Sequence, residues 1–318
     1  MKVLITGVAG LIGSHLADII LESDIEELVG IDNLSFGNKN NLKKAFKNSN
    51  FTFIQDDINK ESFKGKKFDV IFHLASLKKA WDGSLNSSQI MFENFLMTKK
   101  ILELAKEKDA FLVFTSTSDI YGNSETFSED EEIRFTASDI ERYSYALSKF
   151  HSEQLIFNFA REHDLEIAIP RIFGCASNRS NLKWSGGHIG LFCNQAKYDE
   201  NIIIHGDGLQ TRSISHALDI SKGLFDLIKN KQSVLNQIIN IGTDEEISIL
   251  DTANYIIRKF DSKSKIVHKP FDEMFGRYPQ IRRRFANTEK AKKLINYKVN
   301  YSSKYVFDEI IDHVKSKA

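Results

Sequence analysis

Short apolar runs alternate with longer amphipathic stretches over about the first 170 residues. Six runs are rich in β-branched and aromatic side chains without strict apolar–polar alternation: Lys2–Thr6, Glu27–Ile31, Phe51–Gln55, Phe68–His73, Phe111–Thr115 and Leu165–Ile169. Such runs are typical of parallel strands that are covered on both faces. Helical periodicity marks three stretches between them, Leu11–Ser23, Ile90–Lys108 and Tyr143–His163. The alternation predicts an α/β fold with a doubly wound parallel sheet.

The pattern changes after Pro170 and Arg171. Residues 174–187 are rich in serine, asparagine and glycine and predict a loop. The sequence then predicts, in order, a helix at Ile189–Lys197, a turn at His205–Gly208, a helix at Ala217–Lys229, a strand at Gln237–Ile241 and two further helices. We expect residues 1–171, with a return segment at about 213–242, to form the sheet domain. Residues 172–212 and 243–318 should form a smaller α/β C-terminal lobe that binds substrate.

The composition excludes several classes of protein. Of 318 residues, 43 are basic and 43 acidic, so no net charge favours binding to nucleic acid or to an anionic membrane. The two cysteines, Cys175 and Cys193, form no Cys-x-x-Cys pair, which argues against a disulfide scaffold and a zinc site. No membrane span or signal-peptide cleavage site is evident. We therefore expect a cytoplasmic protein with no bound metal and no nucleic-acid or membrane partner.

A glycine motif, TGVAGLIG at residues 6–13, follows the first predicted strand and opens the first predicted helix. Gly7 permits a tight turn, Gly10 lets the backbone approach a pyrophosphate, and Gly13 lets the helix pack closely on the strand. The helix N-terminus adds N–H groups and a positive dipole. Asp32 comes 19 residues after Gly13, at the end of the second predicted strand, where it can accept hydrogen bonds from an adenosine ribose. An acid there repels a 2′-phosphate, so the motif predicts a Rossmann-type domain that binds NAD rather than NADP.

A second motif combines hydroxyl groups with a tyrosine–lysine pair. The predicted strand Phe111–Thr115 leads into residues 116–122, STSDIYG, and Tyr145 and Lys149 follow four residues apart. That spacing places both side chains on one helix face. A nearby ammonium lowers the pKa of a phenol, which makes tyrosinate a usable base. The carboxyl end of a parallel strand is where such sheets bind their ligands, so Thr117 is expected at the same place.

In these motifs the sequence resembles the extended short-chain dehydrogenases/reductases that act as nucleotide-sugar epimerases, dehydratases and decarboxylases. The resemblance covers nearly the whole chain and rests on TGVAGLIG at 6–13, DNLS at 32–35, QDDI at 55–58, IFHLA at 71–75, STSDIYG at 116–122, YALSK at 145–149 and HGDGLQTRS at 205–213. It implies an NAD-dependent enzyme whose substrate is a nucleoside-diphosphate sugar. It also implies a homodimer, formed by the helices at 90–108 and 143–163, and a role in polysaccharide biosynthesis.

The resemblance also implies roles for individual residues. The cofactor would be bound by Gly7, Gly10, Leu11, Ile12, Gly13, Asp32, Asn33, Asp57, Ile58, Leu74, Ala75, Lys78, Tyr145 and Lys149. The catalytic residues would be Thr117, Asp119, Tyr145 and Lys149. The substrate would be bound by Thr117, Trp184, Arg212 and Arg284. Among these, Tyr145 is the expected base for the sugar 4-hydroxyl, and Arg212 and Arg284 are expected to grip the nucleotide diphosphate, a task that suits the planar guanidinium.

The position two residues after Thr117 bears on the reaction. In the families that the chain resembles, many epimerases have a small or hydroxyl residue at this position, whereas dehydratases and decarboxylases have glutamate. This chain has Asp119 there. A carboxylate there can serve as a base at C5, so the sequence favours 4,6-dehydration through a 4-keto intermediate. A 4-epimerase is the alternative, followed by a decarboxylase of the UDP-glucuronate type and a 4-dehydrogenase. A non-catalytic NAD-binding sensor or scaffold is the non-enzyme alternative.

One further departure from the family pattern concerns the substrate. The family usually shows asparagine after Arg-x-Phe, whereas this chain reads Arg171-Ile172-Phe173-Gly174. Loss of that side chain removes a contact to the nucleotide sugar, so we expect the sugar to be bulkier or to sit differently.

Overall fold

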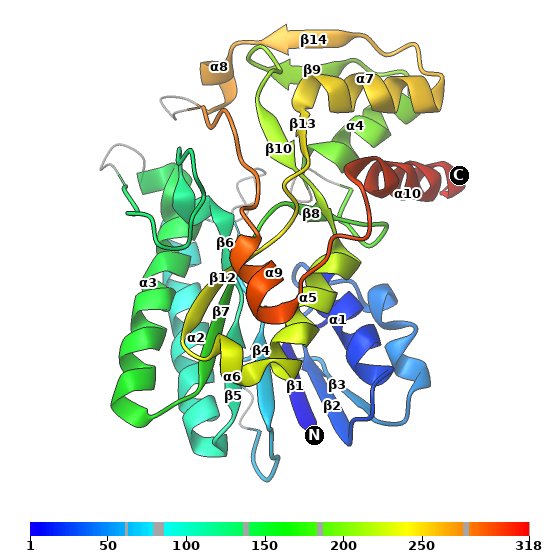
Figure 1. Ribbon diagram of the computed structural model, residues 1–318. Coiled ribbons are helices and arrows are strands. Elements are labelled where there is room, and N and C mark those ends of the chain that lie inside the picture. The colour runs from blue at the N-terminus through cyan, green and yellow to red at the C-terminus, as the bar shows by residue number, and fades with distance from the viewer. Residues whose placement is uncertain (61–62, 79–85, 136–139, 183–186, 276–279, 318) are drawn as a thin grey trace.

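The computed structural model describes residues 1–60, 63–78, 86–135, 140–182, 187–275 and 280–317. Its centre is a parallel sheet of eight strands in the order β12-β7-β5-β4-β1-β2-β3, with β6 paired to β7 (Figure 1). The strands are β1 (Lys2–Thr6), β2 (Glu27–Ile31), β3 (Phe51–Ile54), β4 (Val70–His73), β5 (Phe111–Phe114), β6 (Ser116–Thr117), β7 (Ile167–Ile172) and β12 (Gln237–Ile241). The fold class predicted from the sequence is confirmed.

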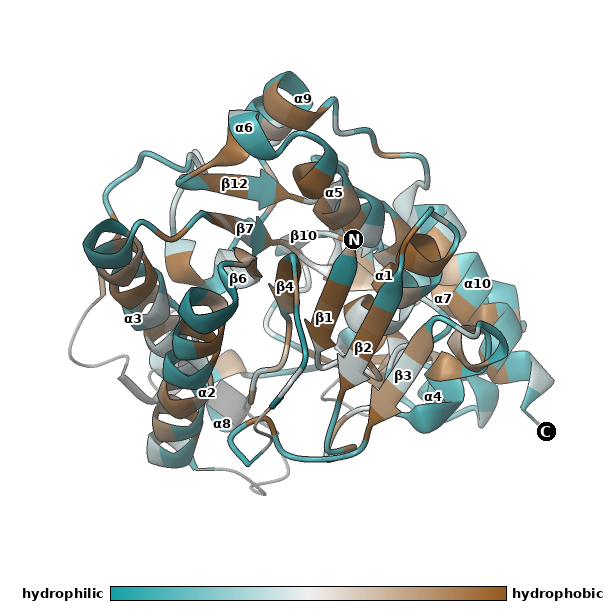
Figure 2. Cartoon of the chain, turned by 90° about the horizontal axis from the view of Figure 1, so that it is seen from below, coloured by the Kyte–Doolittle hydropathy of each residue, from teal (hydrophilic) through white to brown (hydrophobic). Residues whose placement is uncertain are grey.

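Helices cover both faces of this sheet (Figure 2). One face packs on α1 (Leu11–Leu21), α5 (Ala217–Lys229) and α9 (Glu289–Ile295), and the other on α2 (Ser87–Lys108) and α3 (Ile140–His163). Successive residues of β1 alternate between the two cores: Val3 and Ile5 pack with Leu16 of α1, and Leu4 packs with Ile101 of α2. Because both faces are buried, the strand reads as a continuous apolar run.

The carboxyl ends of the strands converge where the strand order reverses. From β1 the chain adds β2 and β3 on one side, and β4, β5 and β7 on the other. The register aligns Thr6 with His73 and His73 with Phe114, so β1, β4 and β5 end level with one another. Thr117 of β6 lies opposite Ile172 of β7. Ligands of doubly wound sheets bind at such a switch point, and both sequence motifs begin there.

A second group of elements lies beyond these carboxyl ends, at the top of Figure 1. It contains α4 (His188–Lys197), α7 (Ile249–Phe260), α10 (Ser303–Ser316), and the paired strands β9 (Ile202–His205) with β14 (Ile266–Lys269) and β10 (Thr211–Ser213) with β13 (Glu246–Ser248). The short strands β8 (Cys175–Ala176) and β11 (Ser215–His216) pair at its base. Its own apolar core includes Phe192, Ile256 and Phe307. The domain boundaries given above stay a prediction.

The remaining described helices are short. They are α6 (Lys231–Val234), α8 (Phe271–Phe275) and the 3₁₀ turns Lys39–Leu42, Ala45–Lys47 and Ser118–Tyr121. After residue 241 the described residues form four helices, α7 to α10, and not the two that were predicted. The helices α8 and α9 have only five and seven residues, too few to show a helical period. Strand β7 also runs on to Ile172 instead of ending at Ile169, since all six of its residues are buried. Within the described part of the chain, no helix is both long and apolar enough to cross a membrane.

Candidate active site

The glycine motif forms the tight turn between β1 and α1. Gly7 has a φ of +70°, and a β-carbon there would lie 2.8 Å from the backbone nitrogen of Ala75. A β-carbon at Gly13 would collide with the carbonyl oxygen of Gly7. Gly10 is the N-cap of α1, and no side-chain hydrogen bond caps the helix there. The first turn of α1 therefore presents backbone N–H groups and a positive dipole, which fit a pyrophosphate.

Asp32 directly follows β2 and lies beside this turn. Its Oδ2 accepts a hydrogen bond from the N–H of Ala9 at 3.0 Å, and its Oδ1 accepts one from Leu34 at 2.8 Å. Burial raises the pKa of the carboxyl, and the two N–H donors oppose the rise. A β-carbon at Gly37 would lie 2.8 Å from the carboxylate, so glycine leaves this approach open. The acid is positioned to accept hydrogen bonds from ribose hydroxyls.

The other residues predicted to contact the cofactor lie around the same switch point. They are Leu11 and Ile12 in the first turn of α1, Asn33 after Asp32, Asp57 and Ile58 after β3, and Leu74, Ala75 and Lys78 after β4. The hydroxyl oxygen of Thr6 accepts a hydrogen bond from the N–H of Ala75 at 3.1 Å and lies 2.7 Å from Nδ1 of His73. His73 is thus a hydrogen-bonded core histidine that fixes the end of β4 beside Gly7.

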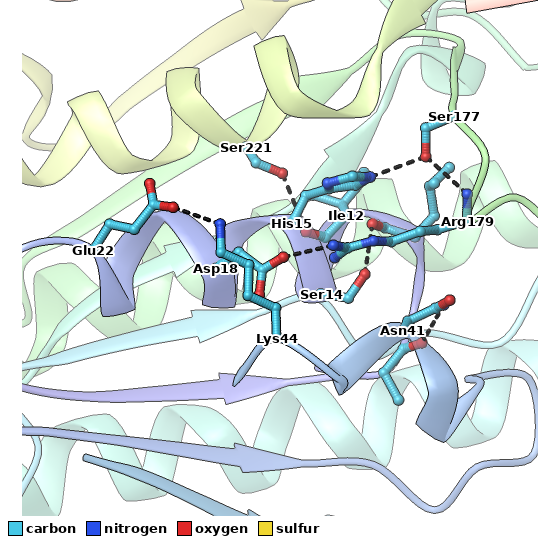
Figure 3. A network of polar contacts seen from close by, with 12 residues as sticks. Ile12, Ser14, His15, Asp18, Glu22, Asn41, Lys44, Ser177, Arg179 and Ser221 are labelled. Carbon is cyan, nitrogen blue, oxygen red and sulfur yellow. Dashed lines mark hydrogen bonds and ion pairs between the residues drawn. The ribbon is translucent and has the colours of Figure 1, made fainter. Parts of the chain in front are cut away.

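Polar contacts tie α1 to the second group of elements (Figure 3). The Nε2 atom of His15 lies 2.9 Å from the hydroxyl oxygen of Ser177, and Arg179 donates a hydrogen bond to Asp18 at 2.6 Å. Burial lowers the pKa of His15 to about 3, and the charge of Arg179 contributes, so the ring is neutral at neutral pH. These contacts join the helix of the glycine motif to residues 177–179.

Tyr145 lies on α3 with its hydroxyl among the residues of the second motif. The hydroxyls of Thr117, on β6, and Ser76, which follows β4, lie near it, where hydrogen bonding to either lowers the pKa of Tyr145. Burial raises the pKa of Tyr145 well above its usual range, and the charge of Asp119 raises it further. The two hydrogen bonds oppose this rise. Taken together these effects favour the protonated phenol at neutral pH, with Nζ of Lys78 lying 5.7 Å from the centre of the Tyr145 ring.

Lys149 supplies a positive charge one helical turn from Tyr145. Its Nζ donates a hydrogen bond to the carbonyl of Thr115 at 3.0 Å and lies 4.5 Å from the centre of the Phe114 ring. Burial lowers the pKa of Lys149 to about 7, and the charge of Glu153 acts in the opposite direction. The structure thus brings Thr117, Tyr145 and Lys149 to one place; their part in catalysis stays a prediction.

Asn94 of α2 joins this place to its surroundings and was missed by the sequence analysis. Its Oδ1 accepts a hydrogen bond from the N–H of Leu77 at 2.8 Å, and its Nδ2 donates to Ser148 of α3 at 2.9 Å. It therefore fixes residues 76–77 against the helix that carries Tyr145. The sequence feature that could have revealed it is a polar residue at a buried position of the helix, between the buried residues Ile90 and Met97.

Asp119 and Arg284 form an ion pair, in which Nη1 of Arg284 donates to Oδ1 of Asp119. The two arginines that precede Arg284, Arg282 and Arg283, are 57% exposed and pair with Asp207 and Glu246. The Arg284 side chain is only 13% exposed. Its Nε and Nη2 atoms are buried and have no hydrogen-bond partner among the described residues. The sequence predicted that Arg284 grips a diphosphate, whereas in the structure it contacts the predicted C5 base.

Two predicted substrate residues remain, Trp184 and Arg212. Trp184 lies outside the described residues. Arg212 of β10 donates to the carbonyl of Thr211 at 2.6 Å, and the backbone of β10 is hydrogen-bonded to residues 282–284. The charge of Arg212 also reaches His188 at the start of α4, whose pKa is lowered to about 4, mainly by burial. Arg212 and Arg284 therefore lie on adjacent segments.

Gly174 packs closely against the end of β10, and the expected effect on the size or position of the sugar stays a prediction. A β-carbon there would lie 2.6 Å from the carbonyl oxygen of Ser213 and 3.3 Å from Cδ1 of Ile214. The backbone at the end of β10 occupies the space that a side chain would fill, and the N–H of Ser215 donates to the carbonyl of Gly174 at 2.8 Å. The glycine lets these two segments pack together.

Several known proteins are similar to this chain in sequence or in structure. The chain is 31% identical to UDP-glucuronic acid decarboxylase 6 of Arabidopsis thaliana, over 93% of this chain and 84% of the relative. It is 31% identical to UDP-N-acetyl-alpha-D-glucosaminuronate decarboxylase of Bacillus cytotoxicus, over 95% and 94% of the two chains. The solved structure of UDP-glucuronic acid 4-epimerase from Bacillus cereus, in complex with UDP-glucuronic acid and NAD, superimposes with a TM-score of 0.88 at 25% identity over 100% of both chains.

The sequence model of one family matches residues 3–242, which include the glycine turn, Thr117, Tyr145 and Lys149. This match spans most of the chain and agrees with the two decarboxylase relatives. The protein is an NAD-dependent nucleotide-sugar enzyme and belongs to the NAD dependent epimerase/dehydratase family.

Proposed function

We propose that this protein removes the C6 carboxyl group of a UDP-hexuronate after oxidising C4, and is thus an NAD-dependent decarboxylase of the UDP-glucuronate type. The observation that carries the proposal is the ion pair between Asp119 and Arg284. An unpaired carboxylate beside Tyr145 would repel the carboxylate of a hexuronate. Paired with Arg284, Asp119 leaves this part of the site without net charge.

Arg284 can also engage the substrate directly. Its Nε and Nη2 are buried, and neither has a partner among the described residues. A guanidinium presents five N–H donors in a rigid fork, and it binds carboxylates through two parallel hydrogen bonds. Arg284 would thus bind Asp119 through Nη1 and the C6 carboxylate through the other two nitrogens. Leaving these buried donors unpaired would cost about 1–3 kcal/mol each, which favours an anionic sugar over a neutral one.

The first step uses the residues around Tyr145. As phenolate, Tyr145 takes the proton of the sugar 4-hydroxyl, Thr117 orients that oxygen through its own hydroxyl, and Lys149 stabilises the phenolate. NAD, when bound, accepts the hydride from C4 and can return it. Gly7, Gly10, Gly13 and Asp32 would hold it, because the open first turn of α1 fits its pyrophosphate and the carboxylate fits its ribose.

The second step needs no strong base. Once C4 is a ketone, the C6 carboxylate belongs to a β-keto acid. The bond between C5 and C6 breaks, carbon dioxide leaves, the electron pair moves onto the C4 oxygen, and C5 then takes up a proton. In 4,6-dehydration, by contrast, Asp119 would have to accept the C5 proton, and its pairing with Arg284 makes the carboxylate a weaker base. For this reason we prefer decarboxylation to the dehydration that the sequence favoured.

A 4-epimerase of UDP-hexuronates is the second candidate, supported by the superposition on the Bacillus cereus enzyme. It would use the same contacts to Arg284 but would retain C6. Proton NMR in deuterated water, with UDP-glucuronic acid as substrate, separates the candidates. Decarboxylation gives a C5 methylene, epimerisation a hexuronate with inverted C4, and oxidation alone a retained 4-keto hexuronate. A 6-methyl signal from a UDP- or dTDP-hexose would instead establish dehydration.

We also propose that two copies of the chain associate through α2 and α3. Phe92 on α2 is 70% exposed, and Met91 and Leu96 on the same helix are 37% and 39% exposed. Phe92 and Leu96 lie four residues apart on one helix face, so they form an apolar stripe. Exposed apolar stripes of this kind are typical of interfaces. Light scattering of the Phe92→Glu variant tests this: a dimer should become a monomer, and an unaltered mass would contradict the proposal.

A further inference from the structure

A buried ion pair lies next to the predicted catalytic helix face and is not used in the mechanism above. Nε and Nη2 of Arg171, on β7, donate to the two carboxylate oxygens of Glu153, on α3, at 3.0 and 2.7 Å. The side chains of Arg171 and Glu153 are 3% and 0% exposed. The Arg171 guanidinium lies 4.8 Å from the centre of the Tyr121 ring, and Tyr121 donates to Asn240 at 2.7 Å.

The position of Glu153 on α3 connects the pair to the tyrosine and lysine. Tyr145, Lys149 and Glu153 succeed one another at intervals of four residues, so they lie along one side of the helix. Lys149 is 2% exposed, and its ammonium lies beside the carbonyl of Thr115 and the ring of Phe114. Glu153 is the acid whose charge favours the ammonium.

We propose that Glu153, fixed in place by Arg171, keeps Lys149 protonated beside Tyr145, so that both are positioning residues of the active site. This inference rests on the proposed roles of Tyr145 and Lys149. A buried ammonium tends to lose its proton, because the charged form is poorly solvated. A buried carboxylate one helical turn away offsets that tendency. Arg171 is needed because Glu153 is itself fully buried, and a buried carboxylate without a charged partner is costly.

The other groups around Lys149 do not take over this task. His73 of β4 is neutral, since burial and the charge of Lys149 both lower its pKa. Phe114 and Thr115, at the end of β5, contribute a ring and a carbonyl but no charge. On the side of α2, Asn94 and Thr98 bond to Ser148 and Ser152 of α3, and all four are uncharged. Asp119 acts on Tyr145, where its charge disfavours the phenolate.

The ionic form of the pair is not required for packing. Buried ion pairs are often replaced by apolar residues of similar volume without loss of stability, whereas removal of one partner is strongly destabilising. Methionine suits both sites because it fills irregular space and packs on aromatic rings such as Tyr121. A double substitution, Glu153→Met with Arg171→Met, should therefore fold, and it removes the charge next to Lys149 without leaving an unpaired one.

The test is the ionisation of Tyr145, followed by ultraviolet phenolate absorbance against pH, with and without NAD. Subtracting the curve of the same protein carrying Tyr145→Phe isolates this residue from the other tyrosines. We expect the apparent pKa of Tyr145 to rise by about one pH unit or more in the Met/Met variant, with kcat/KM near neutral pH falling about tenfold. Glu153→Gln alone should raise the apparent pKa of Tyr145 at least as far, because the unpaired charge of Arg171 would then disfavour the charged form of Lys149.

An unchanged pKa of Tyr145 in a folded Met/Met variant would overturn the inference and leave the pair a structural one. Arg179→Met with Asp18→Met, the ion pair between α1 and residue 179, is the matched control and should not move the titration of Tyr145. The titration requires no substrate. If UDP-glucuronic acid is not turned over, the proposed function fails, while the shift between the two titration curves still decides the role of Glu153.

Discussion

Asp119 and Arg284 lie 165 positions apart in the sequence and form an ion pair beside Tyr145. Asp119 belongs to the motif after β5, and Arg284 to the segment that runs along β10. The pair therefore connects the sheet domain to the elements beyond its carboxyl edge. It also bears on what each residue can do, since the guanidinium balances the charge of the carboxylate and is itself held through Nη1.

Arg284→Gln should lower kcat/KM for UDP-glucuronic acid by about 100-fold, because a charge-assisted contact to a buried carboxylate contributes about 1.5–3 kcal/mol. Binding of UDP and of NAD should change little. The matched control is Arg283→Gln, whose arginine is exposed and pairs with Glu246. If the Arg284 variant loses UDP affinity by the same factor, Arg284 grips the diphosphate, as the sequence suggested.

Tyr145→Phe should abolish turnover while NAD binding is retained, since the substitution removes only the hydroxyl that takes the substrate proton. Tyr143→Phe serves as its control, because Tyr143 is buried on the same helix and is not among the predicted catalytic residues. Steady-state rates and fluorescence titration with NAD measure the two effects. A Tyr145→Phe protein that is as active as the unaltered one would show that Tyr145 is not the base. Absence of turnover in both proteins, with NAD bound by both, would favour a sensor or scaffold over an enzyme.

Gly174→Ala should destabilise the protein by about 1–3 kcal/mol, the usual cost of forcing extra volume into a packed site. The added β-carbon would meet the carbonyl oxygen of Ser213 at 2.6 Å, and a backbone atom cannot turn aside as a flexible side chain can. Urea unfolding measures the change in the free energy of unfolding. An unchanged midpoint would mean that the segments around Gly174 and Ser213 are more loosely packed than the structure shows.

His15 should make the protein less stable in acid. Its pKa is about 3 in the folded protein and about 6.5 in the unfolded chain, so only the unfolded chain takes up this proton between those values. Its contribution to stability is complete above pH 6.5 and falls by up to about 1.4 kcal/mol per pH unit below it. His15→Gln can still bond to Ser177 and should make the loss of stability between pH 7 and 5 shallower. An equal slope in both proteins would contradict this account.

Much of the fold could be predicted from the sequence, because the sheet is buried on both faces and its strands are continuous apolar runs. The glycine turn could also be predicted, because Gly7 and Gly13 occupy positions where a β-carbon would not fit. The pairs β8–β11 and β10–β13 could not be predicted, because strands of two or three residues carry no period.

Contacts between segments that are distant in the sequence could not be predicted either. The spacing of Tyr145 and Lys149 is local to one helix and was informative, and Glu153 at the next interval carried the same signal. By contrast, nothing local indicates that Arg284, the last of three successive arginines, is the buried one. Its burial follows from the pairing of residues 282–284 with β10, which only the folded chain brings about.

The most direct test uses UDP-glucuronic acid labelled with ¹³C at C6 and the purified protein with NAD. The account predicts release of the label as carbon dioxide, a product that lacks C6, and loss of both in the Arg284→Gln variant. Complete retention of the label in the sugar, with C4 inverted or left as a ketone, would contradict decarboxylation.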